Sequence, residues 1–329
     1  MRAKTAARAA APAAGYATTP EAGQTVHTAV SVSPIFSASR SIGDILVANG
    51  RLTQDSAQQI LEYQQAHHVP FGEAALALRL LTKEDIDFAL SQQYDYAYLS
   101  TSNTSLSPML LAAYQPFGAV SESMRAVRSQ LMLRWLNKPP ENKVLRWLNK
   151  AGANKVLAIV SPRTGDGRSF VASNLAIVFA QQGQRTLLID ADLRAKPEQG
   201  QQAMFKLGKN FGLSGILANR AGMEVATLVP GLPNLAVIPA GANPPNPQEL
   251  LGRLAFGNLL EAANQQFDVV LIDTPAGSVY ADSEIIAARA RNALMVSRRN
   301  ATRIPDVIQL AQRLQSSGVE LIGSVLNDA

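Results

Sequence analysis

The most informative stretch of the sequence is residues 156–169, which read Val-Leu-Ala-Ile-Val-Ser-Pro-Arg-Thr-Gly-Asp-Gly-Arg-Ser. Its first five residues are all apolar and predict a short buried strand, while the apolar spacing after Ser169 predicts a helix that begins at the end of the stretch. Gly165 and Gly167 let backbone N–H groups turn inward around phosphate oxygens, and the helix N-terminus adds its positive end. The stretch therefore predicts a strand, a phosphate-binding loop and a helix, although a simple tight turn is the alternative.

Apolar strands and helical segments continue to alternate towards the C-terminus. We expect strands at 156–160, 186–189, 235–238, 269–272, 293–296 and 321–326, with helices that include 170–182, 247–263 and 305–316. Short apolar strands with helical crossovers predict an α/β fold, a doubly wound and mostly parallel sheet with helices on both faces. Ligands of such sheets bind at the carboxyl ends of the strands.

Two acidic motifs fall at the ends of predicted strands. Residues 187–194 read Leu-Leu-Ile-Asp-Ala-Asp-Leu-Arg and contain Asp190 and Asp192, and residues 269–275 read Val-Val-Leu-Ile-Asp-Thr-Pro and contain Asp273. Three carboxylates at the same edge of a sheet as a phosphate loop would repel one another unless a divalent cation neutralised them. We therefore predict a Mg²⁺ site here, with Ser169, Asp190 and Asp273 as its ligands.

The chain resembles the bacterial tyrosine kinases of exopolysaccharide assembly, which carry a second acidic motif on a P-loop NTPase scaffold. The resemblance extends from Glu122 to Asn327 and rests on the phosphate loop, both acidic motifs, residues 122–128 and the Asn-Pro-Pro-Asn-Pro-Gln-Glu-Leu-Leu of 243–251. Together with the helical repeat before it, the chain is similar to the EpsG-type subgroup, which is associated with a membrane chain-length-determinant protein.

This resemblance implies an ATP-dependent protein-tyrosine kinase that regulates exopolysaccharide chain length and export. The implied nucleotide contacts are Gly165, Asp166, Gly167, Arg168, Ser169 and Phe170, with Asn327 beside the adenine ring. Ser169 and Asp273 would hold Mg²⁺, Asp190 would accept the tyrosine proton, and Asp192 would support the metal. The chemistry implied is in-line transfer of the γ-phosphoryl group, which depends mainly on positioning and charge neutralisation.

Arg168 occupies the position of the P-loop lysine. A guanidinium is planar and bulkier than an ammonium, so the exchange is not conservative where one ammonium bridges two phosphates. Because the charge survives, we expect nucleotide binding to be retained more readily than catalysis. An alternative is therefore a catalytically weak ATP-binding scaffold. A second alternative is a partition-type positioning ATPase, because Arg163 stands where such relatives carry a signature lysine. The favoured interpretation of Arg163 is nevertheless a solvated loop residue.

The chain before residue 99 divides into two segments. Residues 1–38 are rich in Ala, Thr and Ser with interspersed prolines and predict a disordered arm, with a transit peptide as the alternative. Residues 39–98 contain a repeat at an offset of 29, in which each copy reads as two short helices. This repeat resembles the N-terminal domain of type II secretion ATPases, some of which bind cyclic di-GMP. Ser41 and Pro70 replace the arginines of that site, so a docking or spacer module is favoured.

Residues 99–156 form a predicted linker with two notable features. Glu122, Arg125 and Arg128 share one helical face. In the family such a face packs onto the next subunit of a ring, so we expect a homo-oligomer, and a solvated helix with local ion pairs is the alternative. Residues 133–144 are duplicated as 145–156, which predicts a lengthened, partly looped connector.

Tyr94, Tyr96 and Tyr98 occupy every second position at the end of the helical repeat domain, just before the linker. Packing at a domain edge is the favoured interpretation of these tyrosines, and a role as phosphoryl acceptors is the alternative. No tyrosine follows Tyr280, so the family's usual C-terminal acceptors have no counterpart in this sequence.

The composition and the charge distribution exclude several further classes of protein. The 329 residues include no cysteine, which excludes disulfides and thiolate chemistry, and the longest apolar runs are too short to span a bilayer. The net charge of +5 is concentrated in 121–156, with eight basic and two acidic residues, and not in the predicted sheet domain 157–329. We therefore expect no nucleic-acid partner. We expect a cytoplasmic protein held at the inner face of the plasma membrane by its partner, with peripheral membrane contact through the basic segment.

Overall fold

The computed structural model describes residues 41–94, 97–99, 103–137, 154–196 and 199–328. The arm expected at 1–38 and most of the duplicated connector, residues 138–153, lie outside these residues.

The repeat forms four helices, two from each copy, as its sequence predicts. They are α1 (Ile42–Ala48), α2 (Gln54–His67), α3 (Phe71–Ala77) and α4 (Lys83–Gln93). Thr82 and Asp85 form a capping box at the start of α4, and Ser41 with Asp44 forms the equivalent box at α1. The apolar faces of the four helices enclose a hydrophobic core of their own.

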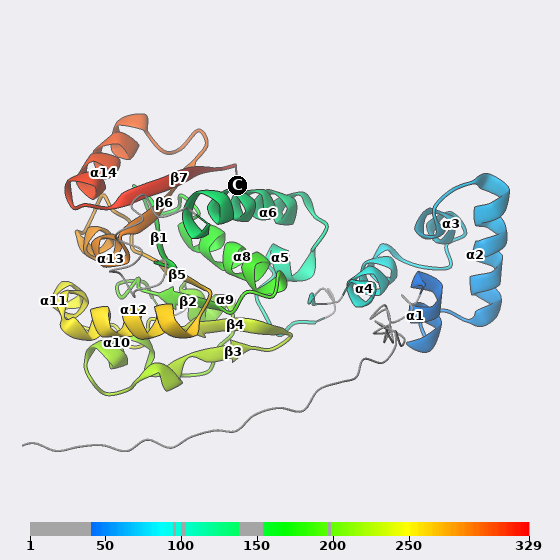
Figure 1. The fold of residues 1–329 in the computed structure, drawn as a ribbon, viewed down its shortest axis with the longest axis horizontal. Coiled ribbons are helices and arrows are strands. Elements are labelled where there is room, and N and C mark those ends of the chain that lie inside the picture. Colours follow the sequence, from blue (N-terminus) through cyan, green and yellow to red (C-terminus); the bar gives the residue numbers. More distant parts are fainter. Residues whose placement is uncertain (1–40, 95–96, 100–102, 138–153, 197–198, 329) are drawn as a thin grey trace, which may run out of the picture. The chain divides into compact units, whose positions relative to one another are not determined.

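A seven-stranded sheet forms the centre of the C-terminal part of the chain (Figure 1). Its strands are β1 (Val156–Val160), β2 (Thr186–Asp190), β3 (Thr227–Val229), β4 (Leu232–Ile238), β5 (Val269–Asp273), β6 (Asn292–Arg298) and β7 (Glu320–Asn327). The spatial order is β3-β4-β2-β5-β1-β6-β7, and every pair is parallel except β3 with β4. The six predicted strands are all present. The edge strand β3 was not predicted, because its three residues form no recognisable apolar run.

Helices cover both faces of the sheet because alternate residues of each strand point to opposite sides. In β1, Leu157 and Ile159 pack with α5 (Leu111–Tyr114), α6 (Ala119–Leu131), the π-helical η1 (Met132–Leu136) and α8 (Arg168–Gln181). The other β1 side chains pack with α10 (Gly212–Leu217), α11 (Pro247–Gly252), α12 (Leu254–Gln266), α13 (Asp282–Ala290) and α14 (Ile304–Ser316). The predicted doubly wound α/β architecture is confirmed.

The single helix predicted at 247–263 is wrong, because the segment contains two helices. Arg253 ends α11 and begins α12 with an extended backbone (φ −67°, ψ 157°). Gly252, with its high conformational freedom, immediately precedes the break. The short helices α9 (Gln201–Met204) and α10, the 3₁₀ turn η2 (Met223–Val225), and α13 were not predicted individually.

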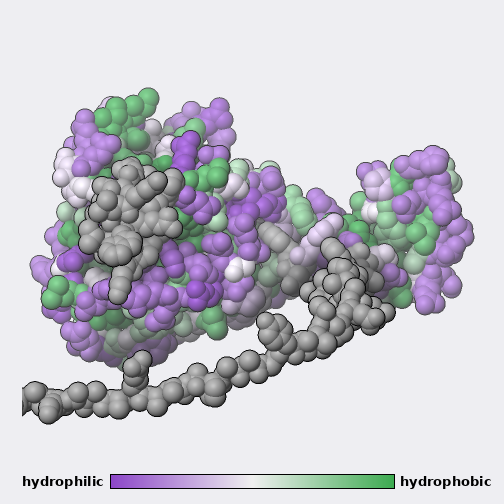
Figure 2. Space-filling view, viewed as in Figure 1, coloured by the Kyte–Doolittle hydropathy of each residue, from purple (hydrophilic) through white to green (hydrophobic). Residues whose placement is uncertain are grey.

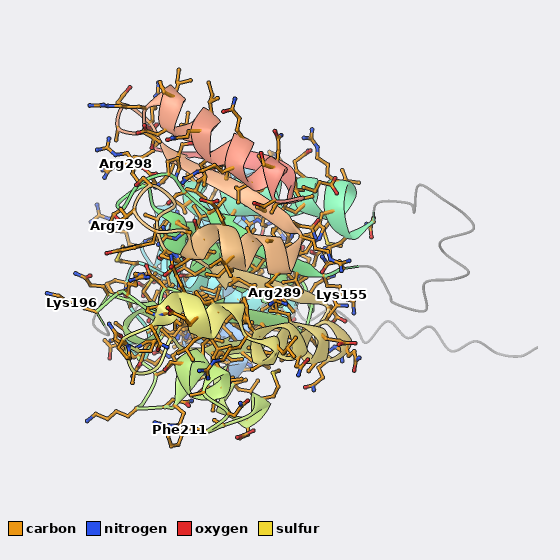
Figure 3. All side chains as sticks on the ribbon, turned by 90° about the vertical axis from the view of Figure 1, so that its left-hand side faces the viewer. Arg79, Lys155, Lys196, Phe211, Arg289 and Arg298 are labelled. Carbon is orange, nitrogen blue, oxygen red and sulfur yellow. The ribbon has the colours of Figure 1, made fainter. Side chains whose placement is uncertain are left out.

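The carboxyl ends of the parallel strands all lie at one edge of the sheet, where the predicted site residues belong. Arg298 at the end of β6 and Lys196 after β2 project on one side of the molecule, and Lys155 before β1 lies on the opposite side (Figure 3).

Hydrophilic residues cover much of the face in Figure 2, and hydrophobic ones gather over α14, where Ile304 and Ile308 are exposed. Within the described ranges, no helix combines the length and the apolar character that crossing a membrane requires.

Candidate active site at the carboxyl edge of the sheet

The phosphate loop joins β1 to α8 and adopts a glycine-dependent turn. Gly165 and Gly167 both have positive φ, at 88° and 90°. A Cβ on Gly167 would lie 2.0 Å from Nδ2 of Asn327, so any side chain there would collide with the end of β7. Asn327 Nδ2 also donates to the carbonyl of Asp166 at 3.1 Å. The structure therefore brings the predicted adenine contact, Asn327, directly against the loop.

Asp166 closes the loop with its side chain. One carboxylate oxygen accepts the backbone N–H of Arg163 at 2.8 Å, and the other accepts the hydroxyl of Thr302 at 2.6 Å. Because Asp166 is only 3% exposed, its carboxylate stabilises the turn from inside, and only its backbone is placed to face a nucleotide. Arg163 is exposed and donates Nη1 to the carbonyl of Ala301 at 3.3 Å, which agrees with the favoured interpretation of a loop residue.

Arg168, at the P-loop lysine position, turns its guanidinium into the acidic site. Nε donates to Asp273 Oδ1 at 3.1 Å, Nη2 to Asp192 Oδ2 at 3.3 Å, and Nη1 to Ser161 Oγ at 3.0 Å. The side chain is 9% exposed. The planar guanidinium presents a separate nitrogen to each of the three acceptors, and its positive charge is balanced by the two carboxylates.

The acidic motifs meet because β2 and β5 are neighbouring parallel strands. Asp190 and Asp273 end these strands in direct register, and each is 1% exposed. Burial, and then the negative charge of Asp273, raise the pKa of Asp190 above its usual range. Burial also raises the pKa of Asp192, while the charge of Arg168 opposes that rise.

The remaining predicted site residues are the first ones of α8. Ser169 is half-buried, and its carbonyl accepts from Ser173 Oγ at 2.5 Å and from Gln201 Nε2 at 3.2 Å. Phe170 is half-buried and packs against the hydrophobic core that contains Leu157. The structure thus places Ser169 beside the acidic cluster, whereas Phe170 has a packing role.

The donor chemistry of the site suits Mg²⁺, since a serine hydroxyl and aspartate carboxylates are the hard oxygen ligands that this ion prefers. In the part of the chain that the structure describes, however, no three His, Cys, Asp or Glu side chains converge as a ready-made metal site. The guanidinium of Arg168 lies between Asp192 and Asp273 instead. The serine and the aspartates therefore suit Mg²⁺ once the guanidinium of Arg168 moves away from Asp192 and Asp273.

Three contributors to the site were missed in the sequence. Gln201 contacts both acidic motifs from α9, and Gly200 lies against Asp190. Arg194 binds the fully buried Asp282 through two bonds of 2.7 and 3.2 Å, which ties the chain after the first acidic motif to α13. A buried amide and a distant ion pair have no local sequence signature, so sequence patterns alone could not single them out.

The expected oligomerisation residues lie on α6 and make bonds within their own chain. Arg125 donates to the carboxylate of Glu122 and to the carbonyl of Pro116, and Arg128 Nη1 donates to the carbonyl of Val178 at 2.7 Å. Of the tyrosine cluster, Tyr94 is exposed and Tyr98 is half-buried, whereas Tyr96 lies outside the described residues. Packing at a domain edge and a role as acceptors both remain predictions for these tyrosines.

A glycine-rich loop between strand and helix, with aspartates ending the adjacent strand pair, defines a P-loop NTPase-like nucleotide-binding fold. A family model described as an AAA domain matches residues 154–312.

Relatives and solved structures define the family more closely. The chain is 35% identical over 218 residues to tyrosine-protein kinase YwqD of Bacillus subtilis (strain 168), covering 66% of this chain and 85% of YwqD. It is 32% identical over 217 residues to tyrosine-protein kinase Etk of Escherichia coli (strain K12), covering 66% of this chain but only 28% of Etk. The kinase domain of E. coli Etk superposes with a TM-score of 0.59 at 31% identity, covering 70% of this chain and 84% of the domain. The chimerical protein CapA2B2 gives 0.58 at 29% identity, with coverage of 75% and 98%. The chain belongs to the bacterial tyrosine-protein kinase family, as its motifs predict.

Proposed function

We propose that this protein is a Mg²⁺-dependent kinase that transfers the γ-phosphoryl group of ATP to protein tyrosines and regulates exopolysaccharide chain length and export. The observation that carries this proposal is the register of Asp190 with Asp273 beside the phosphate loop. Loop amides, the start of α8 and a basic side chain bind the phosphates. Bound Mg²⁺ would be held by Ser169, Asp273 and Asp190, with support from Asp192, and would neutralise phosphate charge.

Asp190 supplies the base for this reaction. The bond from the γ-phosphorus to the bridging oxygen breaks, a bond to the phenolic oxygen forms, and the phenolic proton passes to the carboxylate of Asp190. Burial, and then the charge of Asp273, raise the pKa of this carboxyl in the metal-free protein.

Membership of the family supports a proposal for the partner and the location. We propose a membrane chain-length-determinant protein as partner, a ring of identical subunits joined through Glu122, Arg125 and Arg128, and a position at the inner face of the plasma membrane. The intrachain bonds of Arg125 and Arg128 fix these side chains on α6 and leave Glu122 on its exposed side.

The contacts of Arg168 favour a second candidate, an ATP-binding scaffold with little phosphoryl transfer. In this arrangement the cation required by the phosphates already pairs with Asp192 and Asp273. Binding of ATP would then compete with two internal ion pairs, and the nucleotide state would control docking and assembly.

Labelled ATP separates the two candidates. The purified full chain is incubated with γ-labelled ATP, Mg²⁺ and a tyrosine-containing peptide, beside an Asp273→Asn control. Mg²⁺-dependent label on tyrosine above the control supports the kinase. Transfer equal to the control, with ATP binding retained in a filter assay, would leave the scaffold.

A further inference from the structure

Gln201 makes an unusual number of contacts for a side chain that sequence patterns do not single out. It is the first residue of α9 and is fully buried, at 0% exposure. Its backbone N–H donates to Asp190 Oδ2 at 2.8 Å, and its side-chain Nε2 donates to Asp273 Oδ2 at 2.8 Å. One residue thus binds the carboxylates that end two neighbouring strands.

The amide group of Gln201 is oriented by α8. Nε2 also donates to the carbonyl of Ser169 at 3.2 Å, and Oε1 accepts the hydroxyl of Ser173 at 2.8 Å. The Ser169 carbonyl and the Asp273 carboxylate can only accept, so a flipped amide would face its oxygen towards both of them. The direction of the Nε2 bond is therefore fixed by the helix that follows the phosphate loop.

The contacts of Gln201 also fix the rotation of Asp273. Gln201 binds Oδ2, while Arg168 binds Oδ1 from the other side. If Arg168 turns towards a phosphate, the bond to Gln201 still holds Oδ2. Oδ1 is then the oxygen that Asp273 presents to the site.

Gly200 allows the same short segment to approach Asp190. A Cβ on Gly200 would lie 2.6 Å from Asp190 Oδ2, which is closer than a side chain tolerates. Without that Cβ, the backbone N–H of Gln201 reaches the carboxylate. Packing alone does not require a polar residue at this place, since the neighbouring Met204 and Phe205 anchor the segment in the apolar core.

We propose that Gln201 is a positioning residue for phosphoryl transfer: it holds Asp273 in the rotation that presents Oδ1 to Mg²⁺ and holds Asp190 in place as the base. This role rests on the proposed kinase function. Partners that orient metal ligands are typically worth about 10–100-fold in metal affinity or activity. No further chemical group is required, because Gln201 acts only through the two carboxylates.

The test compares Gln201→Met with Gln202→Met in the full chain. The two changes are identical and adjacent, but the side chain of Gln202 is half-buried, and its Nε2 donates to the carbonyl of Gly208 at 3.3 Å instead of to a carboxylate. Methionine keeps nearly the volume of glutamine, and the backbone N–H to Asp190 remains. The Ser173 hydroxyl also keeps its bond to the carbonyl of Ser169, so no buried donor is left unsatisfied.

Three measurements are made on each variant: ADP binding by calorimetry with and without Mg²⁺, kcat and KM for ATP, and thermal unfolding. For Gln201→Met we expect the Mg²⁺ concentration at half-effect to rise about 10–100-fold, kcat to fall by a similar factor, and ADP affinity without Mg²⁺ to stay within about twofold. Gln202→Met should match the wild type in all three.

Equal Mg²⁺ dependence of ADP binding in both variants would overturn the positioning role. So would a loss confined to the melting temperature, with kcat per folded molecule unchanged. The wild type decides the proposed function separately. Absence of tyrosine transfer with Mg²⁺-dependent ADP binding retained would refute the kinase, and the calorimetric comparison would still decide whether Gln201 orients the Mg²⁺ ligand.

Discussion

Replacing Arg168 with lysine should make the nucleotide-free protein less stable and the enzyme faster. The guanidinium bonds to Asp273, Asp192 and Ser161 at 3.0–3.3 Å, and a single ammonium on a different stem cannot keep all three contacts. Net values for hydrogen bonds to charged groups are roughly 1.5–3 kcal/mol each. Two such bonds are lost, and part of this loss is regained because the ammonium stays near both carboxylates.

We therefore expect Arg168→Lys to lower the free energy of unfolding by about 2 kcal/mol. For a domain of 150–250 residues this lowers the melting temperature by roughly 4–8 °C. Transfer to tyrosine should rise about tenfold, equivalent to about 1.4 kcal/mol in the barrier, because a compact ammonium bridges β- and γ-phosphate oxygens and binds the acidic cluster less tightly. The measurements are thermal unfolding without nucleotide and initial rates with labelled ATP.

The matched control is Arg185→Lys. Arg185 also binds an aspartate, Asp268, through Nε and Nη2, but its side chain is 58% exposed, so the same substitution should have little effect. The reasoning is refuted if Arg168→Lys melts at the wild-type temperature, since the three buried contacts would then contribute nothing. A variant that loses stability without gaining activity would show that Arg168 does not restrain catalysis.

Three further changes test other parts of the structure. Gly167→Ala forces a Cβ towards Asn327 at a backbone with φ of 90°, so nucleotide binding should fall at least about tenfold in a fluorescent-nucleotide titration. Arg194→Met leaves the carboxylate of Asp282 buried and unpaired and should destabilise the protein by about 3 kcal/mol in urea unfolding. Hydrogen bonds from Arg185 lower the pKa of Asp268 to about 2. Its folded-state pKa is depressed, so the stability it contributes is present above about pH 4 and is lost as the pH falls towards 2. Asp268→Asn should therefore lower the free energy of unfolding slightly at pH 7, by an amount that shrinks between about pH 4 and pH 2.

Much of the fold could be predicted because its signals are local. The apolar run at 156–160, the two glycines after it and the aspartates ending β2 and β5 are properties of short continuous stretches. The helix break at Arg253 could not be predicted, because a favourable apolar spacing continues across it. The edge strand β3 was missed for the opposite reason, since its pairing with β4 and not its own composition makes it a strand.

The phosphate loop, the two acidic motifs and the arginine at a position where lysine is usual can all be identified in the sequence, since each is a fixed order of neighbouring residues. The interactions among these groups depend on the tertiary structure. Parallel pairing of β2 with β5 sets Asp190 beside Asp273, and the guanidinium of Arg168 forms an ion pair with Asp273. The same pairing brings Gln201 to Asp273, 72 positions away in the sequence. Such contacts depend on which strands become neighbours, and burial then gives them their strength by removing the water that would weaken each charge.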